Sequence, residues 1–135
     1  MAGEYHVEGL AVPESLDLLH ALLDRVRNEH GEIDPTELML FETAIIEIHG
    51  NVVQHGRPEG QVLYTFDLEV SEVMLVGVLA DNGEAVPDLS GQEGLVGEDA
   101  ESGRGLGLAR AALDELGFVR RDHQNTWRMV KKRTA

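Results

Sequence analysis

Glu47 and Asn51 are the first two residues whose types and spacing could do chemistry. They stand four positions apart in the run Glu47-Ile48-His49-Gly50-Asn51, so in a helix they would share one face. A carboxylate there could take the proton from an attacking hydroxyl group, and an amide oxygen is a hard ligand suited to Mg²⁺. The pair is also typical of the water-facing side of an amphipathic helix, where such pairs are common. We expect His49, between them, to face the solvent.

Asp81-Asn82-Gly83 is the second candidate, directly after the apolar run at residues 73–80. A carboxylate at the end of a buried strand is well placed to accept a hydrogen bond from a ligand. The same three residues are also ordinary turn chemistry. On its own, this stretch leaves both interpretations open.

Gly103-Arg104-Gly105-Leu106-Gly107 is the third candidate, at the start of a predicted helix. Glycines let the backbone approach a ligand, and a helix N-terminus offers free N–H groups to phosphates. The run follows a loop and not a first strand, so it does not match the dinucleotide-binding pattern of a Rossmann fold. A flexible loop that leads into a helix is the alternative interpretation.

These candidates depend on elements that apolar periodicity predicts. Residues 83–107 hold seven of the fifteen glycines, and we expect a long loop there, of the kind that is usually functional. The predicted elements are, in order, a strand over 4–12, a helix over 13–29, a helix from Asp34-Pro35 to about residue 55, a hairpin of strands 61–69 and 73–80, a helix over 105–116 closed by Gly117, and a hairpin of strands 118–122 and 126–131. Helices and hairpins that are segregated in this way favour an α+β fold.

Composition narrows the possible functions. The chain has 135 residues, which suits a single domain over 1–135, and its net charge is −14. An acidic surface repels phosphate backbones, so we expect no nucleic-acid partner. The chain has no cysteine, and its first lysine is Lys131, which excludes disulfides, thiolate chemistry and a P-loop lysine. No apolar run is long enough to span a membrane and no signal peptide is visible, so we expect a cytoplasmic protein without a membrane partner.

The few basic residues are unevenly placed. Residues 120–135 carry six of the eleven, and we take the Lys131–Arg133 end as a candidate contact for an acidic partner. Arg104 is the only base within 83–107, which makes it the candidate contact for a γ-phosphate. Otherwise a triphosphate site in this chain must rely on Mg²⁺, backbone N–H groups and helix dipoles.

The three candidates, taken in order along the chain, resemble the GHKL (Bergerat-fold) ATP-binding superfamily. Within it, the chain is similar to the small serine kinases that act as anti-sigma factors, and the similarity runs from the first strand to the ending NTWRMVKK. The resemblance implies a two-layer α/β sandwich. It would have a mixed, mainly antiparallel sheet, three main helices on one face, and an ATP lid over 83–104.

The resemblance also implies roles for single residues. Glu47 would be the general base, Asn51 would ligate the Mg²⁺ that holds ATP, and Asp81 would receive the adenine amino group. Ala85 stands where the family's D-x-G-x-G pattern has its second glycine, so the backbone is less free there. The remaining cofactor-binding positions implied are Gly83, Gly103, Gly105, Gly107 and, beside adenine, Thr126.

The function implied is that of a Mg-ATP-dependent serine/threonine-protein kinase. It would phosphorylate an anti-anti-sigma factor, bind a sigma factor and so regulate transcription. The family also tends to form homodimers, which we expect to involve the first strand and the sheet edge. The alternatives are a non-catalytic ATP-binding switch that gates a protein partner, the catalytic domain of a histidine kinase, and an acidic interaction domain without nucleotide.

Overall fold

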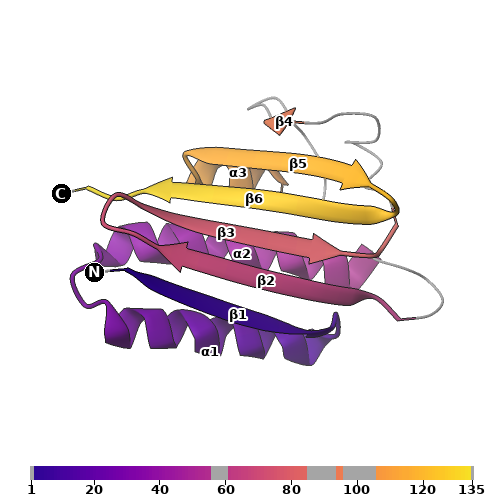
Figure 1. Cartoon of the computed structure of the whole chain (residues 1–135), viewed down its shortest axis with the longest axis horizontal. Coiled ribbons are helices and arrows are strands. Elements are labelled where there is room, and N and C mark those ends of the chain that lie inside the picture. Colours follow the sequence, from indigo (N-terminus) through magenta and orange to yellow (C-terminus); the bar gives the residue numbers. More distant parts are fainter. Residues whose placement is uncertain (1, 56–60, 85–93, 96–105, 135) are drawn as a thin grey trace.

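Six strands and three helices make up the part of the chain that the computed structural model describes, residues 2–55, 61–84, 94–95 and 106–134 (Figure 1). The elements are β1 (Gly3–Leu10), α1 (Pro13–Glu29), α2 (Pro35–His55), β2 (Leu63–Val70), β3 (Met74–Asp81), β4 (Gly94–Leu95), α3 (Leu106–Ala112), β5 (Glu115–Arg121) and β6 (Gln124–Lys132).

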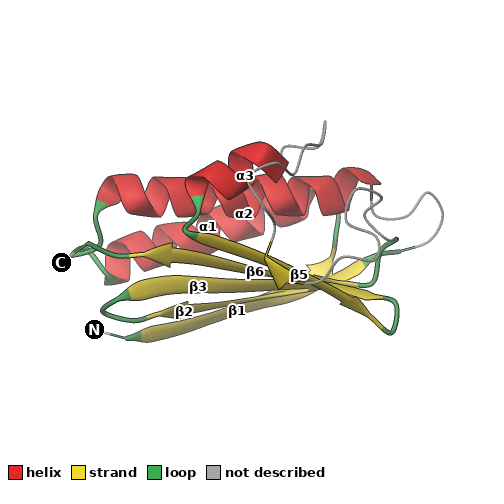
Figure 2. Ribbon diagram, turned by 90° about the horizontal axis from the view of Figure 1, so that it is seen from above, coloured by secondary structure: helices red, strands yellow, loops and turns green. Residues whose placement is uncertain are grey.

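The strands form one sheet in the order β1-β2-β3-β6-β5-β4, and every pairing is antiparallel. Figure 2 shows that α1, α2 and α3 all lie on the same side of this sheet. The expected α+β two-layer sandwich is therefore confirmed. The described pairings are more uniform than the mixed sheet that we expected.

The two long helices begin where the sequence predicts. Pro13 and Pro35 occupy their first positions, where the missing N–H is not needed. The Asp34 side chain caps α2, because its Oδ1 accepts hydrogen bonds from the backbone N–H of Thr36 (2.8 Å) and of Glu37 (3.1 Å). Although α2 has 21 residues, no described helix is both long and apolar enough to span a bilayer.

Alternation along the strands separates a face toward the helices from an open face. On β2, Tyr64, Phe66 and Leu68 point into the core, and the residues between them do not. Gly77 on β3 lets Phe66 pack against the sheet. A Cβ at Gly77 would lie 3.0 Å from Phe66 Cε1 and 3.2 Å from Phe41 Cζ, so a larger residue there would require these aromatic rings to move by a few tenths of an ångström.

The predicted helix over 105–116 is wrong in its second half. The helix α3 ends at Ala112, and Glu115 already pairs with Val130 of β6. Gly117 does not close a helix, because it lies within β5 opposite Arg128. The leucine spacing suited a helix, but pairing with β6 and burial of Leu116 decide the local structure.

The final hairpin is confirmed, with a turn tighter than we predicted. Asp122 and His123 form the connection between β5 and β6, and both have positive φ (51° and 64°). Two residues with positive φ give a turn whose twist matches that of the flanking strands. The position of this turn fixes which side chains of β6 face the helices.

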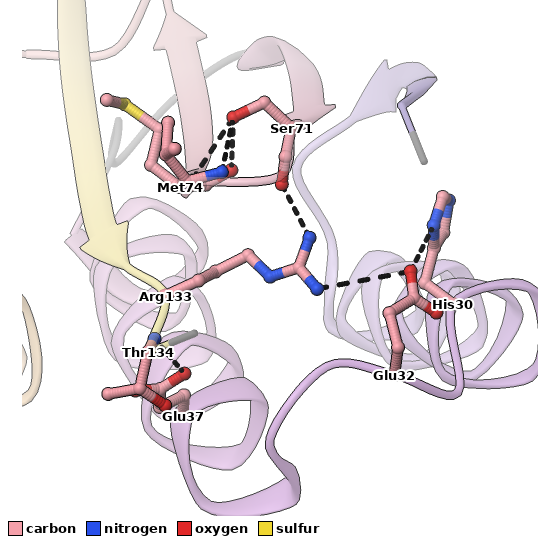
Figure 3. Close-up of polar contacts among 8 residues, drawn as sticks. His30, Glu32, Glu37, Ser71, Met74, Arg133 and Thr134 are labelled. Carbon is pink, nitrogen blue, oxygen red and sulfur yellow. Dashed lines mark hydrogen bonds and ion pairs between the residues drawn. The ribbon is translucent and has the colours of Figure 1, made fainter.

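The chain around Arg133 is held from three directions, as Figure 3 shows. The Arg133 guanidinium donates to the carbonyl of Ser71 in the β2–β3 turn (Nη1–O 2.5 Å) and lies 3.9 Å from the Glu32 carboxylate. The backbone N–H of Thr134 donates to Glu37 Oε1 on α2 (3.1 Å). The side chain of Arg133 is only 7% exposed, so the expectation that it contacts an acidic partner is wrong for this residue.

Candidate functional site

Four side chains form a row across the helix-facing side of the sheet, at the end of β3. Tyr64 of β2 pairs with Asp81 of β3, Asp81 pairs with Asn125 of β6, and Asn125 pairs with Arg120 of β5. The row is almost closed to solvent at Tyr64, Asp81 and Asn125, which are 2%, 4% and 2% exposed. Buried polar groups at a strand end point to a binding site.

Asp81 presents two carboxylate oxygens with different surroundings. Its Oδ1 accepts hydrogen bonds from the backbone N–H of Gly83 (2.8 Å) and from Asn125 Nδ2 (3.1 Å). Its Oδ2 is buried and has no hydrogen-bond partner among the described residues. Burial raises the pKa of Asp81, while the hydrogen bonds from Asn125 and Gly83 and the charge of Arg120 lower it. An unused buried acceptor fits the amino group of a nucleobase.

Arg120 and Asn125 hold Asp81 and the chain after it. Arg120 Nη1 donates to Asn125 Oδ1 (2.8 Å) and to the carbonyl of Gly83 (3.1 Å). Asn125 Nδ2 also donates to the carbonyl of Glu84 (2.9 Å). Three atoms, Asn125 Oδ1, Asn125 Nδ2 and Arg120 Nη1, therefore make the hydrogen bonds that hold the segment 81–84. Neither residue was predicted from the sequence.

Thr126, the expected adenine contact, is not beside Asp81. It pairs with Ala80 and Val119, one position along the strand from Asn125. Successive side chains of a strand point to opposite faces, so Thr126 lies on the open face, where Gln124 Nε2 is 3.3 Å from its hydroxyl. The sequence could have indicated Asn125, because it lies two and four positions before Trp127 and Met129. These are buried apolar residues of β6, so all three side chains point to the same face of the strand.

The pair Glu47 and Asn51 lies one turn apart on α2, with both side chains partly exposed. Their neighbour His49 connects this turn to the row, since its ring centroid is 4.4 Å from that of Tyr64. Figure 1 shows the C-terminal half of α2 at the same end of the molecule as the end of β3. The structure thus brings Glu47, Asn51 and Asp81 to one end of the helix–sheet interface.

His49 does not face the solvent, as we had expected, but is fully buried. Its Nε2 lies 2.6 Å from the hydroxyl of Ser15 at the start of α1, and burial lowers its pKa to about 4. The ring is therefore neutral at pH 7. The spacing to Ile45 and Val52, both buried, shows that His49 belongs to the core stripe of α2. Two more buried atoms nearby, His49 Nδ1 and Tyr64 Oη, have no described partner.

The expected phosphate loop is described only in part. Gly83 is buried and bonded to Asp81 and Arg120, and Gly107 stands exposed in the first turn of α3. Gly103, Arg104, Gly105, Ala85 and most of the lid over 83–104 lie outside the described residues. Within the described parts, no group of three or more carboxylate or imidazole side chains could hold a metal ion. The Asn51 amide oxygen is a ligand type that suits Mg²⁺.

Comparison with known proteins supports a nucleotide-binding fold. The structure resembles that of the RsbU and RsbW domains of Rv1364c from Mycobacterium tuberculosis, with a TM-score of 0.69 and 17% sequence identity. The match covers 98% of this chain and 33% of the other, so this chain spans about a third of that neighbour. At this identity the likeness concerns the fold alone. A search of curated proteins finds no match. The family model of the histidine kinase-like ATPase domain matches residues 10–131, and the chain therefore belongs to this family.

Proposed function

We propose that this chain is a Mg-ATP-dependent serine kinase that regulates transcription as an anti-sigma factor. In this proposal it phosphorylates a serine of an anti-anti-sigma protein and otherwise binds a sigma factor. The buried, unpartnered Oδ2 of Asp81 carries the nucleotide part, because it offers an acceptor for the adenine amino group. The sequence resemblance and the RsbW domain of the structural neighbour support the regulatory part.

The side chains of the site have separate tasks in this proposal. The Asn51 amide oxygen holds Mg²⁺, which would offset the negative charge of the triphosphate. The Glu47 carboxylate accepts the proton of the partner's serine hydroxyl as the oxygen–phosphorus bond forms and ADP leaves. The glycines Gly103, Gly105 and Gly107 and the side chain of Arg104 contact the phosphates. Since the chain is so acidic, metal and backbone N–H groups supply most of the positive potential.

Nucleotide binding can be tested first, by thermal unfolding with and without Mg-ATP. Ligand at 100 times its Kd stabilises the folded state by about 2.7 kcal/mol. We expect an increase in Tm that requires Mg²⁺ and is lost in Asp81→Asn, whose amide cannot take the place of both carboxylate oxygens. An unchanged Tm at millimolar Mg-ATP would contradict both the proposed kinase function and the alternative of a non-catalytic ATP-binding switch.

The catalytic role is tested by phosphate transfer from labelled ATP to a candidate anti-anti-sigma protein. Glu47→Gln should keep the Tm increase with Mg-ATP and lose transfer by two orders of magnitude or more. Glu42→Gln is a matched control, because Glu42 lies on the same helix but contacts Arg27 and His20. Normal transfer by Glu47→Gln would exclude Glu47 as the base. Binding without transfer in the wild type would favour the non-catalytic switch.

A further inference from the structure

His49 connects α2 to two neighbouring elements at one point. Its ring is fully buried, and its Nε2 lies 2.6 Å from the hydroxyl of Ser15 in the first turn of α1. Its ring centroid is 4.4 Å from that of Tyr64 on β2, and Tyr64 pairs with Asp81 of β3. One side chain of α2 therefore contacts both the start of α1 and the strand beside Asp81.

The hydrogen bond between Ser15 and His49 has a defined direction. The Ser15 hydroxyl lies 2.5 Å from the carbonyl of Val12, which can only accept. The single hydroxyl proton is therefore donated to Val12, and we assign the proton of the neutral His49 ring to Nε2, which donates it to Ser15 Oγ. Ser15 is itself buried, so water does not compete for this bond.

Glu47 and Asn51 lie on the side of α2 opposite His49. Successive residues of an α-helix are about 100° apart around its axis, so a position two residues before or after His49 is on the far side of the helix. The exposure of the side chains agrees, because Glu47 and Asn51 are partly exposed and His49 is not. A rotation of this turn about the helix axis would move all three side chains together.

Gly50 weakens the helix in the same turn, because glycine is among the least favourable residues in a helix interior. Among the described residues, a Cβ at Gly50 would meet nothing within 4 Å beyond its own stretch of helix, so packing does not require glycine there. The buried side chains of Ile48 and Val52 hold the turn against the core, but apolar contacts have no preferred direction. A hydrogen bond has one, so it can fix the rotation of the turn.

We infer that Ser15 and His49 are positioning residues for this site. Their hydrogen bond fixes the rotation of the C-terminal half of α2 and so keeps Glu47 and Asn51 in place. The inference rests on the proposed function for the roles of Glu47 and Asn51. A displacement of about 1 Å can lower a reaction rate by about two orders of magnitude, so a contact on the far side of the helix can decide the rate of transfer.

Hydrogen exchange tests the contact without nucleotide or partner. In Ser15→Ala, which removes the acceptor of His49 Nε2–H, we expect the amides of residues 47–53 to exchange at least about fivefold faster than in the wild type. The amides of residues 36–44 should be unchanged, because the loss is local to one half of α2. His49→Leu should have the same effect, since Ser15 keeps the Val12 carbonyl as its partner and no buried donor is left unpaired.

Kinetics test the consequence for the reaction. In phosphate transfer to a candidate anti-anti-sigma protein, both variants should lose at least about tenfold in kcat, while KM for ATP changes less than about threefold because Asp81 is untouched. Ser71→Ala is the matched control, since its hydroxyl accepts from the backbone N–H of Val73 and Met74 in the β2–β3 turn, and it should keep the wild-type kcat. Circular dichroism at the assay temperature confirms that each variant is folded.

Three results would overturn the inference. One is unchanged exchange of residues 47–53 in both variants, and another is faster exchange with a normal kcat. The third is an equal loss of kcat in Ser71→Ala, which would indicate general destabilisation. A wild type that transfers no phosphate would contradict the proposed function instead, and the exchange experiment would still decide whether Ser15 and His49 hold this turn.

Discussion

The buried imidazole of His49 should make this protein sensitive to mild acid. In the folded state its pKa is lowered to about 4 because the ring is buried, whereas in the unfolded chain it is near 6.5. Below pH 6.5 the unfolded state therefore binds a proton that the folded state does not. Stability contributed by the neutral ring is fully present above pH 6.5 and is lost as the pH falls toward 4.

The size of the effect follows from the two pKa values. Linkage gives a loss of about 2 kcal/mol in the free energy of unfolding between pH 7.5 and pH 5, and about 3 kcal/mol once the pH is below 4. That loss is a substantial part of the 5–15 kcal/mol that is usual for a domain. Urea unfolding at pH 7.5 and at pH 5, followed by circular dichroism, measures it.

Comparison with His49→Gln isolates this residue from other titrating groups. An uncharged amide can still contact the Ser15 hydroxyl, so the variant should lose about 2 kcal/mol less than the wild type between the two pH values. His20→Gln is the control, because His20 is half exposed on the surface of α1, and it should behave as the wild type does. Equal losses in the wild type and in His49→Gln would refute the reasoning.

Three further predictions follow from the contacts described above. Asn125→Ala should weaken binding of ATP at least tenfold but hardly change that of inosine triphosphate, because inosine has no amino group for Asp81; equal losses, measured by calorimetry, would exclude a role in base recognition. Arg133→Gln should lower the free energy of unfolding by about 1–3 kcal/mol, against less than about 0.5 kcal/mol for the exposed control Lys132→Gln, both measured in urea. Tyr64→Phe should leave the stability unchanged or raise it, since the hydroxyl is buried without a described partner; a loss above 1 kcal/mol would show that it has one.

Much of the fold could be predicted because its apolar patterns are long. The stripes of α1 and α2 and the alternation of β2 predicted elements that the structure confirms. The segment after Ala112 could not be predicted in this way, because Leu113 and Leu116 fit a helix as well as a strand. Its structure depends on pairing with β6, a contact that local sequence does not reveal.

Glu47, Asn51 and Asp81 could be predicted as site residues from the sequence. Arg120 and Asn125, which form hydrogen bonds to Asp81 and to the residues after it, could not. Asp81 and the spacing of Glu47 and Asn51 stood out from the sequence alone. The choice between Asn125 and Thr126 depended on the position of the hairpin turn, because a shift of one residue exchanges the two faces of a strand. The role of Arg120 could not be predicted for a different reason. Its hydrogen-bond partners, Gly83 and Asn125, come from two other segments of the chain.

The order of the strands has a consequence for how the chain folds as it is synthesised. The last strand in the sequence, β6, lies inside the sheet between β3 and β5. Until it emerges from the ribosome, β3 keeps an unpaired edge, and the apolar side chain of Leu79 lacks its partner Trp127. Unpaired apolar edges promote aggregation. The nascent chain therefore exposes this apolar edge until the hairpin of β5 and β6 has emerged.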